Sequence, residues 1–187
     1  MSTGPVTVPL RVLWWCALLL AIVTGSAIAA GTGDASDNAV PDDGGDISRY
    51  YVLVQAFFPA ADHIGPLAGE PPAAEVHAAG RVVGYVYLTD HILPIPAYSG
   101  KPISTLVALD LEGHIAGVRI VHHEEPILLA GVSEQQLHAY VAQYQGIDVR
   151  DRIKVGGRPA EGMAIVDAIS GATITAMVIN QTIAKTA

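Results

Sequence analysis

The chain has little cysteine and few basic residues. It holds one cysteine, Cys16, and 10 Lys and Arg residues against 18 Asp and Glu residues, for a net charge of −8 over 187 residues. The basic residues do not cluster, which argues against nucleic acid or an anionic membrane face as a partner. Because Cys16 lies in an N-terminal apolar run, a chain processed after that run has no disulfide and no cysteine-ligated cluster.

The N-terminal residues 1–30 resemble a secretory signal in their build. Arg11 precedes an apolar run over residues 12–23, and small residues end the segment at Ala29 and Ala30. We predict cleavage after one of these two alanines. An uncleaved membrane anchor is the alternative, because the apolar stretch is about long enough to span a bilayer. In both cases the domain that follows is expected to face outward.

An acidic linker is predicted to separate this segment from a single folded domain. Residues 31–46 hold five Asp residues among Gly, Ala, Ser and Pro, a composition typical of a flexible connection. Residues 47–187 are long enough to bury one hydrophobic core.

The folded domain is predicted to be α+β. A helix is expected to begin at Asp46 or Ser48 and to end before Pro59. Two hairpins follow, at residues 75–89 with Gly84 as a candidate bulge, and at residues 103–123. Two consecutive hairpins imply a small, mostly antiparallel sheet with flanking helices.

The C-terminal third is predicted to add two helices and one strand. Ser133 opens a capping box with Gln136, so a helix is expected to begin there. Residues 150–158 are charged and contain glycine, which favours a loop. A short apolar strand at residues 162–166 then leads toward a helix over residues 172–187.

The stretch Asp-Ala-Ile-Ser-Gly-Ala-Thr at residues 167–173 joins that strand to that helix. With Ser170 as the N-cap, Thr173 falls at position N3. Free N–H groups and the helix dipole favour a phosphate there, and Gly171 and Ala172 leave the approach open. A plain capped helix, in which Thr173 bonds the local backbone, is the alternative. Local physics therefore predicts an anion site without naming the anion.

The same stretch resembles the flavinylation motif of the FMN-binding domain family, which is found in the RnfG and NqrC electron-transfer subunits and in NosR. In that family the final threonine carries FMN through a phosphoester bond, which implies covalent FMN on Thr173. Upstream segments are similar to the periplasmic part of NosR, in the same order, so that the resemblance covers residues 50–183. These segments are residues 57–66, 84–86, 98–103 and 122–127.

A loop at residues 97–100 is implied to hold the flavin ring. Its sequence Ala-Tyr-Ser-Gly is similar to the family's Gly-Tyr-x-Gly segment, with alanine in place of the first glycine. Tyr98 is therefore the expected wall against the ring. Ser99 and Lys101 are candidate donors to flavin oxygens, although a solvated lysine is the ordinary outcome.

The His-His-Glu-Glu-Pro stretch at residues 122–126 supplies two further candidates. Glu125 and Pro126 lie where RnfG and NqrC have a Glu-Thr-Pro-Gly loop against the flavin, but Ile-Leu-Leu-Ala follows here, as in NosR. His122 and His123 are adjacent on a predicted strand, so their side chains point to opposite faces and cannot easily share an ion. The other histidines have no metal-ligand spacing, and no metal site is predicted.

Asp167 has two interpretations. It either holds the turn out for recognition by a flavin transferase, or it only caps the turn. The resemblance implies a Mg²⁺-dependent transferase of the ApbE type, which takes FMN from FAD.

The resemblance implies an extracytoplasmic, periplasmic redox carrier that relays electrons from the membrane side toward the nitrous-oxide reductase system, without a substrate of its own. The alternative is a secreted binding or regulatory module of the same fold without a working covalent flavin. NosR continues into transmembrane helices and a ferredoxin-like portion, whereas this sequence ends at Ala187. We therefore expect a truncated or standalone form, or a separate electron donor.

Overall fold

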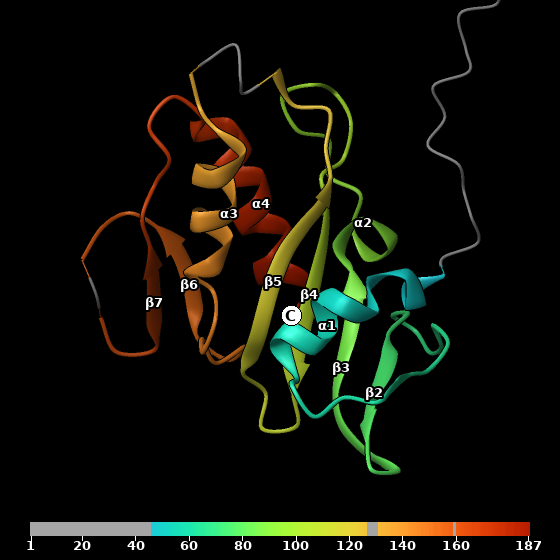
Figure 1. The fold of residues 1–187 in the computed structure, drawn as a ribbon. Helices are drawn as coiled ribbons and strands as arrows, with labels where there is room; N and C mark the ends of the chain where they lie inside the picture. Colours follow the sequence, from blue (N-terminus) through green and yellow to red (C-terminus); the bar gives the residue numbers. More distant parts are fainter. Residues whose placement is uncertain (1–45, 127–130, 159) are drawn as a thin grey trace, which may run out of the picture. The chain divides into compact units, whose positions relative to one another are not determined.

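The computed structural model describes residues 46–126, 131–158 and 160–187 (Figure 1). The predicted signal or anchor and nearly all of the predicted linker lie outside these residues. The elements are η1 (Ile47–Tyr50), α1 (Tyr51–Phe57), β1 (His63–Ile64), β2 (Ala74–Ala78), β3 (Arg81–Leu88), α2 (Thr89–Ile92), β4 (Ser104–Asp110), β5 (Ile115–His122), α3 (Glu134–Ala142), β6 (Arg152–Val155), β7 (Met163–Val166) and α4 (Thr173–Thr186).

Five strands form one antiparallel sheet in the order β1-β2-β3-β4-β5. Strands β2 and β3, and strands β4 and β5, are the two predicted hairpins, so the α+β prediction is confirmed. Strand β1 was not predicted, because its two residues are too few to show an alternating pattern. The predicted first helix is divided in two. Asp46 caps the 3₁₀ helix η1 by accepting the Ser48 N–H at 2.9 Å, and α1 follows and ends at Phe57.

The bulge predicted at Gly84 lies one residue earlier. Val76 pairs with Gly84 and His77 pairs with Val82, which leaves Val83 as the extra residue of β3. Gly84 is needed for a different reason, since a Cβ at this position would overlap the Phe58 ring and the Leu109 carbonyl oxygen.

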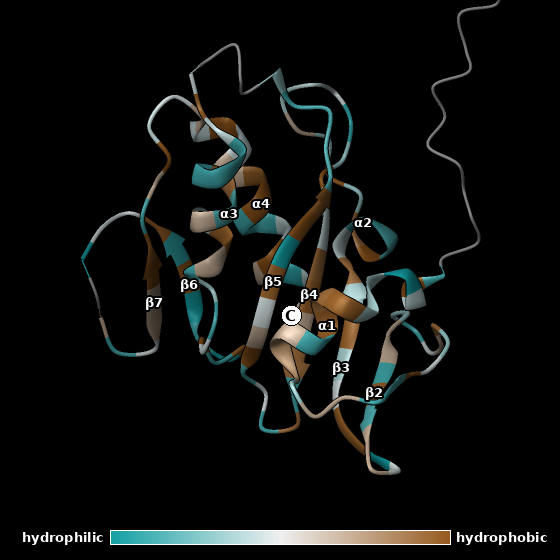
Figure 2. Ribbon diagram, viewed as in Figure 1, coloured by the Kyte–Doolittle hydropathy of each residue, from teal (hydrophilic) through white to brown (hydrophobic). Residues whose placement is uncertain are grey.

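The two faces of the sheet bury two separate hydrophobic clusters. Val54 of α1 packs with Leu106 on one face, whereas Leu137 of α3 and Ile179 of α4 pack with Val107 on the other. The colours of Figure 2 show apolar residues along β4 and β5 between these helices. Because successive strand residues point to opposite faces, β4 contributes to both clusters and is buried over most of its length.

The prediction of a loop over residues 150–158 is wrong for its central residues, which form a strand. Arg152–Val155 forms β6, which pairs in parallel with β7 as a separate two-stranded sheet. Only Ile153 of β6 is buried, and it packs against the α3 and α4 cluster. The strand therefore depends on its partner strand and on α4, which local charge and glycine content do not reveal.

Helix α3 begins as predicted. Ser133 and Gln136 form a complete capping box, and Gly146, at a φ of 84°, follows the end of the helix. Leu137, Tyr140 and Tyr144 are buried against the sheet. None of the helices within the described residues is long and apolar enough to cross a membrane.

Candidate functional site

The start of α4 differs from the prediction. Ala172 is the N-cap, no side chain caps the helix, and Thr173 is the first helical residue rather than the third. The predicted cap at Ser170 is therefore wrong. The Ala172 N–H donates to the Ile169 carbonyl at 3.3 Å, and Gly171 has a φ of 86°. Ser170 and Gly171 are thus the central residues of a β-turn that ends just before the helix.

At the start of α4, several backbone N–H groups and one hydroxyl lack hydrogen-bond partners among the described residues. The first intrahelical bond runs from the Ala176 N–H to the Ala172 carbonyl at 2.9 Å. Within the described residues, the N–H groups of Thr173, Ile174 and Thr175 have no hydrogen-bond acceptor. The Thr173 side chain is exposed, and its hydroxyl also makes no hydrogen bond there. Free N–H groups at the positive end of a 14-residue helix fit a phosphate ester on this hydroxyl.

Asp167 is held by its backbone and leaves its carboxylate free. Its N–H donates to the Gln143 Oε1 at 2.7 Å, at the end of α3. The carboxylate accepts no hydrogen bond from any described residue, so the turn-capping interpretation gains no support.

A hollow of about 270 Å³ lies between α3 and the turn, lined by Gln136, Ala139, Tyr140, Gln143, Ala168, Ile169 and Ser170.

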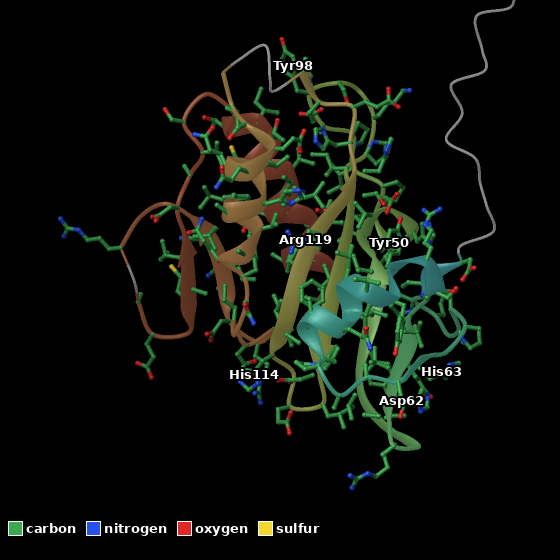
Figure 3. The ribbon with its side chains drawn as sticks, viewed as in Figure 1. Tyr50, Asp62, His63, Tyr98, His114 and Arg119 are labelled. Carbon is green, nitrogen blue, oxygen red and sulfur yellow. The ribbon has the colours of Figure 1, made fainter. Side chains whose placement is uncertain are left out.

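The Tyr98 loop lies at the end of the sheet opposite His114 (Figure 3). A turn holds the loop, with the Gly100 N–H donating to the Ala97 carbonyl at 3.0 Å. Tyr98 is 68% exposed, so its ring is accessible to a ligand. Lys101 Nζ binds Glu124 Oε1 at 2.7 Å, so the lysine predicted as a flavin donor is ion-paired in this structure.

Glu125 joins this loop to α4. Its Oε1 accepts the Ser99 N–H at 2.7 Å, and its Oε2 accepts the Thr175 hydroxyl at 2.6 Å. The structure therefore brings Tyr98, Ser99 and Glu125 to the end of α4 that carries Thr173. Pro126 is exposed, and the residues directly after it are outside the described part of the chain.

Two apolar side chains beside Thr173 were not predicted to belong to the site. Ile174 is 56% exposed and Met177 is 59% exposed. Met177 is four residues after Thr173, and helical side chains lean toward the N-terminus, so it lies on the Thr173 face. The four-residue spacing from the threonine was the available signal for this placement.

The histidines at residues 122 and 123 have separate partners. His123 Nε2 lies 3.0 Å from Glu134 Oε1, whereas His122 Nε2 lies 3.9 Å from Glu124 Oε1. Over the part of the chain that the structure describes, no group of three or more His, Cys, Asp or Glu side chains could hold a metal ion.

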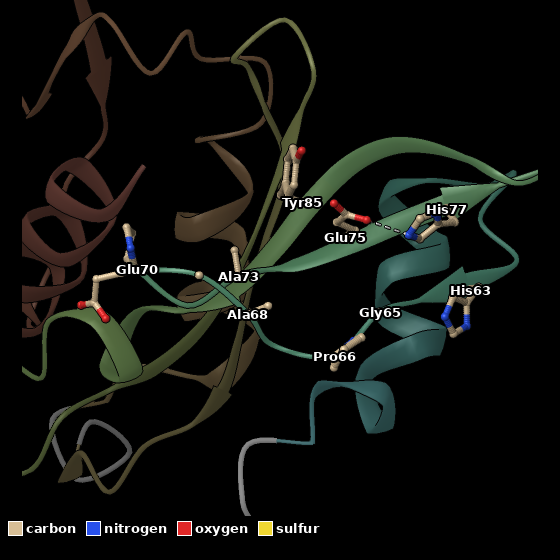
Figure 4. Close-up of a pocket in the computed structure, with 11 residues that line it drawn as sticks. His63, Gly65, Pro66, Ala68, Glu70, Ala73, Glu75, His77 and Tyr85 are labelled. Carbon is tan, nitrogen blue, oxygen red and sulfur yellow. Dashed lines mark ion pairs between the residues drawn. The ribbon is translucent and has the colours of Figure 1, made fainter.

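A separate hollow of about 670 Å³ lies on strands β1 to β3 (Figure 4). His63, Glu75 and His77 line it, with Glu75 Oε2 at 3.1 Å from His77 Nε2. It includes no residue of the Thr173 motif, the Tyr98 loop or the Glu125 segment.

Residues 98–187 match the model of a protein family described as the FMN-binding domain. This segment is an FMN-binding domain. The family predicted from the motif is thereby confirmed, and the matched residues include Thr173, Tyr98 and Glu125. The family therefore favours FMN as the ligand.

Curated relatives extend the similarity upstream of the FMN-binding domain. The chain is 39% identical to the Regulatory protein NosR of Pseudomonas aeruginosa over 130 residues, 70% of this chain and 18% of the relative. It is 37% identical to the Protein NirI of Paracoccus denitrificans over 116 residues, 62% of this chain and 16% of the relative.

A shorter relative is a component of the Ion-translocating oxidoreductase complex of Stutzerimonas stutzeri. It is 32% identical over 133 residues, which is 66% of this chain and 55% of the relative. The chain thus spans about half of this oxidoreductase component and less than a fifth of NosR.

Proposed function

We propose that this FMN-binding domain carries FMN through a phosphoester bond to Thr173 and relays electrons outside the cytoplasm. The observation that carries the proposal is the open start of α4. An exposed threonine hydroxyl at the first helical position stands beside three N–H groups without an acceptor among the described residues. Such a helix start stabilises the negative charge of a phosphate through its N–H groups and its dipole.

The attachment step is a transfer of the FMN half of FAD to the Thr173 oxygen. The Thr173 oxygen attacks the phosphorus on the FMN half of FAD, the phosphoanhydride bond breaks, and AMP leaves. The hydroxyl proton goes to a base of the transferase, which holds Mg²⁺ and is of the ApbE type. The chain's own contribution is to present the hydroxyl on an exposed turn. The free Asp167 carboxylate six residues earlier supports its role in recognition by that enzyme.

The surroundings of Thr173 fit the rest of the cofactor. Bound FMN supplies one- and two-electron chemistry. The exposed side chains of Tyr98, Ile174 and Met177 offer apolar surface to the flavin ring. Ser99 remains a candidate for hydrogen bonding to a polar edge, since its hydroxyl accepts only the Lys101 N–H, at a long 3.3 Å, among the hydrogen bonds of the described residues.

The relatives support a role in denitrification and membrane-linked electron transfer. Similarity to NosR and to a component of an ion-translocating oxidoreductase complex favours an electron carrier. The resemblance of residues 1–30 to a secretory signal favours the periplasm. We propose that it passes electrons from a membrane donor toward the nitrous-oxide reductase system. The name Regulatory protein NosR favours, as a second candidate, a regulatory module without a working covalent flavin.

Expression with a flavin transferase tests the covalent bond. We expect yellow fluorescence that stays with the denatured protein, and a mass increase of one FMN on the peptide that contains Thr173. Thr173→Ser keeps a hydroxyl and should retain loading, whereas Thr173→Val should lose it completely. Flavin that washes out on denaturation contradicts covalent attachment, and a protein without any flavin supports the regulatory module.

A further inference from the structure

Glu125 is a buried carboxylate, whereas most of the other acidic residues that the structure describes are exposed. Its side chain is 6% exposed. A buried charge persists only when hydrogen bonds or a counter-charge compensate for the loss of water. Among the described residues, the Glu125 carboxylate is compensated by hydrogen-bond donors and not by a cation. The nearby Lys101 pairs with Glu124 instead.

These donors come from two segments far apart in the sequence. The Ser99 N–H donates to one carboxylate oxygen at 2.7 Å, and the Thr175 hydroxyl donates to the other at 2.6 Å. The neighbouring Tyr98 N–H also favours the ionised carboxylate and acts to lower its pKa. Glu125 thus holds the backbone of the Tyr98 loop against the first turn of α4, two residues from Thr173.

The backbone of Glu125 is held in place from α3 through His123. The Glu125 N–H donates to His123 Nδ1 at 3.2 Å, and His123 Nε2 lies 3.0 Å from the Glu134 carboxylate. Burial raises the pKa of Glu125, but the hydrogen bonds from Thr175, Ser99 and Tyr98 outweigh it and hold the pKa below its ordinary value. The carboxylate is therefore ionised at neutral pH.

We propose that Glu125 is a positioning residue that fixes the Tyr98 loop over the flavin-attachment turn and sets a permanent negative charge beside the flavin. The inference rests on the proposed function of Thr173. A fixed negative charge close to a flavin disfavours the addition of electrons, and it acts most strongly where water is excluded. Glu125 should therefore lower the reduction potential of the bound FMN.

Two neighbouring glutamates give a matched test of the charge. Glu125→Gln keeps the shape, since the amide oxygen can accept the Ser99 N–H and the amide nitrogen can donate to the Thr175 hydroxyl. We expect this variant to load flavin and to show a more positive midpoint potential in a spectroelectrochemical titration. Glu124→Gln removes the same charge from an exposed pair with Lys101, where solvent and salt screen it, and should shift the potential far less.

The positioning role has a test without flavin. In the flavin-free protein, Glu125→Ala should speed amide hydrogen exchange at Ser99 by about tenfold or more, because its hydrogen bond to a charged group is lost. Thr175→Val should loosen the same link if the alanine variant does not fold, and Thr175→Ser should restore it. Glu125→Gln should stay near the wild-type exchange rate.

The outcomes separate this inference from the proposed function. Equal potentials for wild type and Glu125→Gln contradict the electrostatic role, and unchanged exchange in Glu125→Ala and Thr175→Val contradicts the positioning role. Wild-type protein that takes up no flavin contradicts the proposed function instead, while the exchange experiment still decides whether Glu125 holds the loop.

Discussion

Helices α3 and α4 begin in opposite ways. At the start of α3, Ser133 Oγ accepts the Gln136 N–H at 3.2 Å, and Gln136 Oε1 accepts the Ser133 N–H at 2.8 Å. At the start of α4, the N-cap is Ala172, which has no side-chain oxygen to offer. The comparison distinguishes a helix start that the protein satisfies by itself from one whose N–H groups are left for a ligand.

The two helix starts also differ in where their apolar residues lie. Leu137 of α3 is fully buried, whereas Ile174 and Met177 of α4 are more than half exposed. An apolar surface beside free N–H groups matches an FMN, which has a charged phosphate and a largely apolar ring. The start of α3 therefore serves the fold, and the start of α4 is the candidate site.

Removing apolar side chains should give the largest contrast between the helices. Leu137→Ala leaves a cavity in the core and should lower the free energy of unfolding by about 2–5 kcal/mol. Ile174→Ala removes an exposed side chain and should change it by less than about 0.5 kcal/mol. Urea denaturation of the flavin-free protein measures both. A large loss in Ile174→Ala would show that Ile174 is buried in solution.

Gly171 and Gly146 provide the next contrast, because both have a positive φ, of 86° and 84°. Gly171 lies before α4 and Gly146 lies after α3. Replacing either by alanine should cost about 1–2 kcal/mol of stability, since a Cβ is strained in this conformation. Only Gly171→Ala should also slow flavin loading, because it deforms the turn that presents Thr173. Equal loading in the two variants would mean that the turn geometry is not recognised.

Serine replacements test the capping difference directly. Ser133→Ala removes a capping box and should cost about 1 kcal/mol. Ser170→Ala should change the free energy of unfolding by less than about 0.5 kcal/mol, because Ser170 makes no capping hydrogen bond. Thermal and urea denaturation give both values. A cost at Ser170 as large as that at Ser133 would restore the sequence-based prediction that Ser170 caps α4.

The smallest expected effect is a pH dependence of stability that arises from Glu125, whose carboxylate bonds Thr175 of α4. Burial acts to raise the pKa of Glu125, but the hydrogen bonds of Thr175 and Ser99 outweigh it, so the pKa is lowered. The contribution of Glu125 to stability is present above the unfolded pKa, about 4.3, and is lost as pH falls through the lower folded value. Wild type should therefore lose more stability than Glu125→Gln as the pH is lowered from neutral through this range, as measured by denaturation at each pH. Parallel curves would show that folding does not lower the pKa of Glu125.

Local sequence patterns predicted most of the secondary structure. The capping box at Ser133 and the two hairpins follow from neighbouring residues, because a cap or an alternation is complete within a few positions. The centre of residues 150–158 was missed, since β6 forms only by pairing with β7. The cap at Ser170 was misassigned because a β-turn competes for the same residues, and the local pattern does not decide between them.

The candidate site, too, was predicted from the sequence only in part. The sequence by itself determined the FMN-binding family and the α+β class, because these depend on short motifs and on periodicity, and the same motif is the basis for proposing Thr173 as the acceptor. Only the tertiary structure decided that the start of α4 is open, that Ile174 and Met177 face solvent, and that Glu125 is buried. The physical reason is distance along the chain: Glu125 and Thr175 are 50 positions apart, and only packing brings their side chains together.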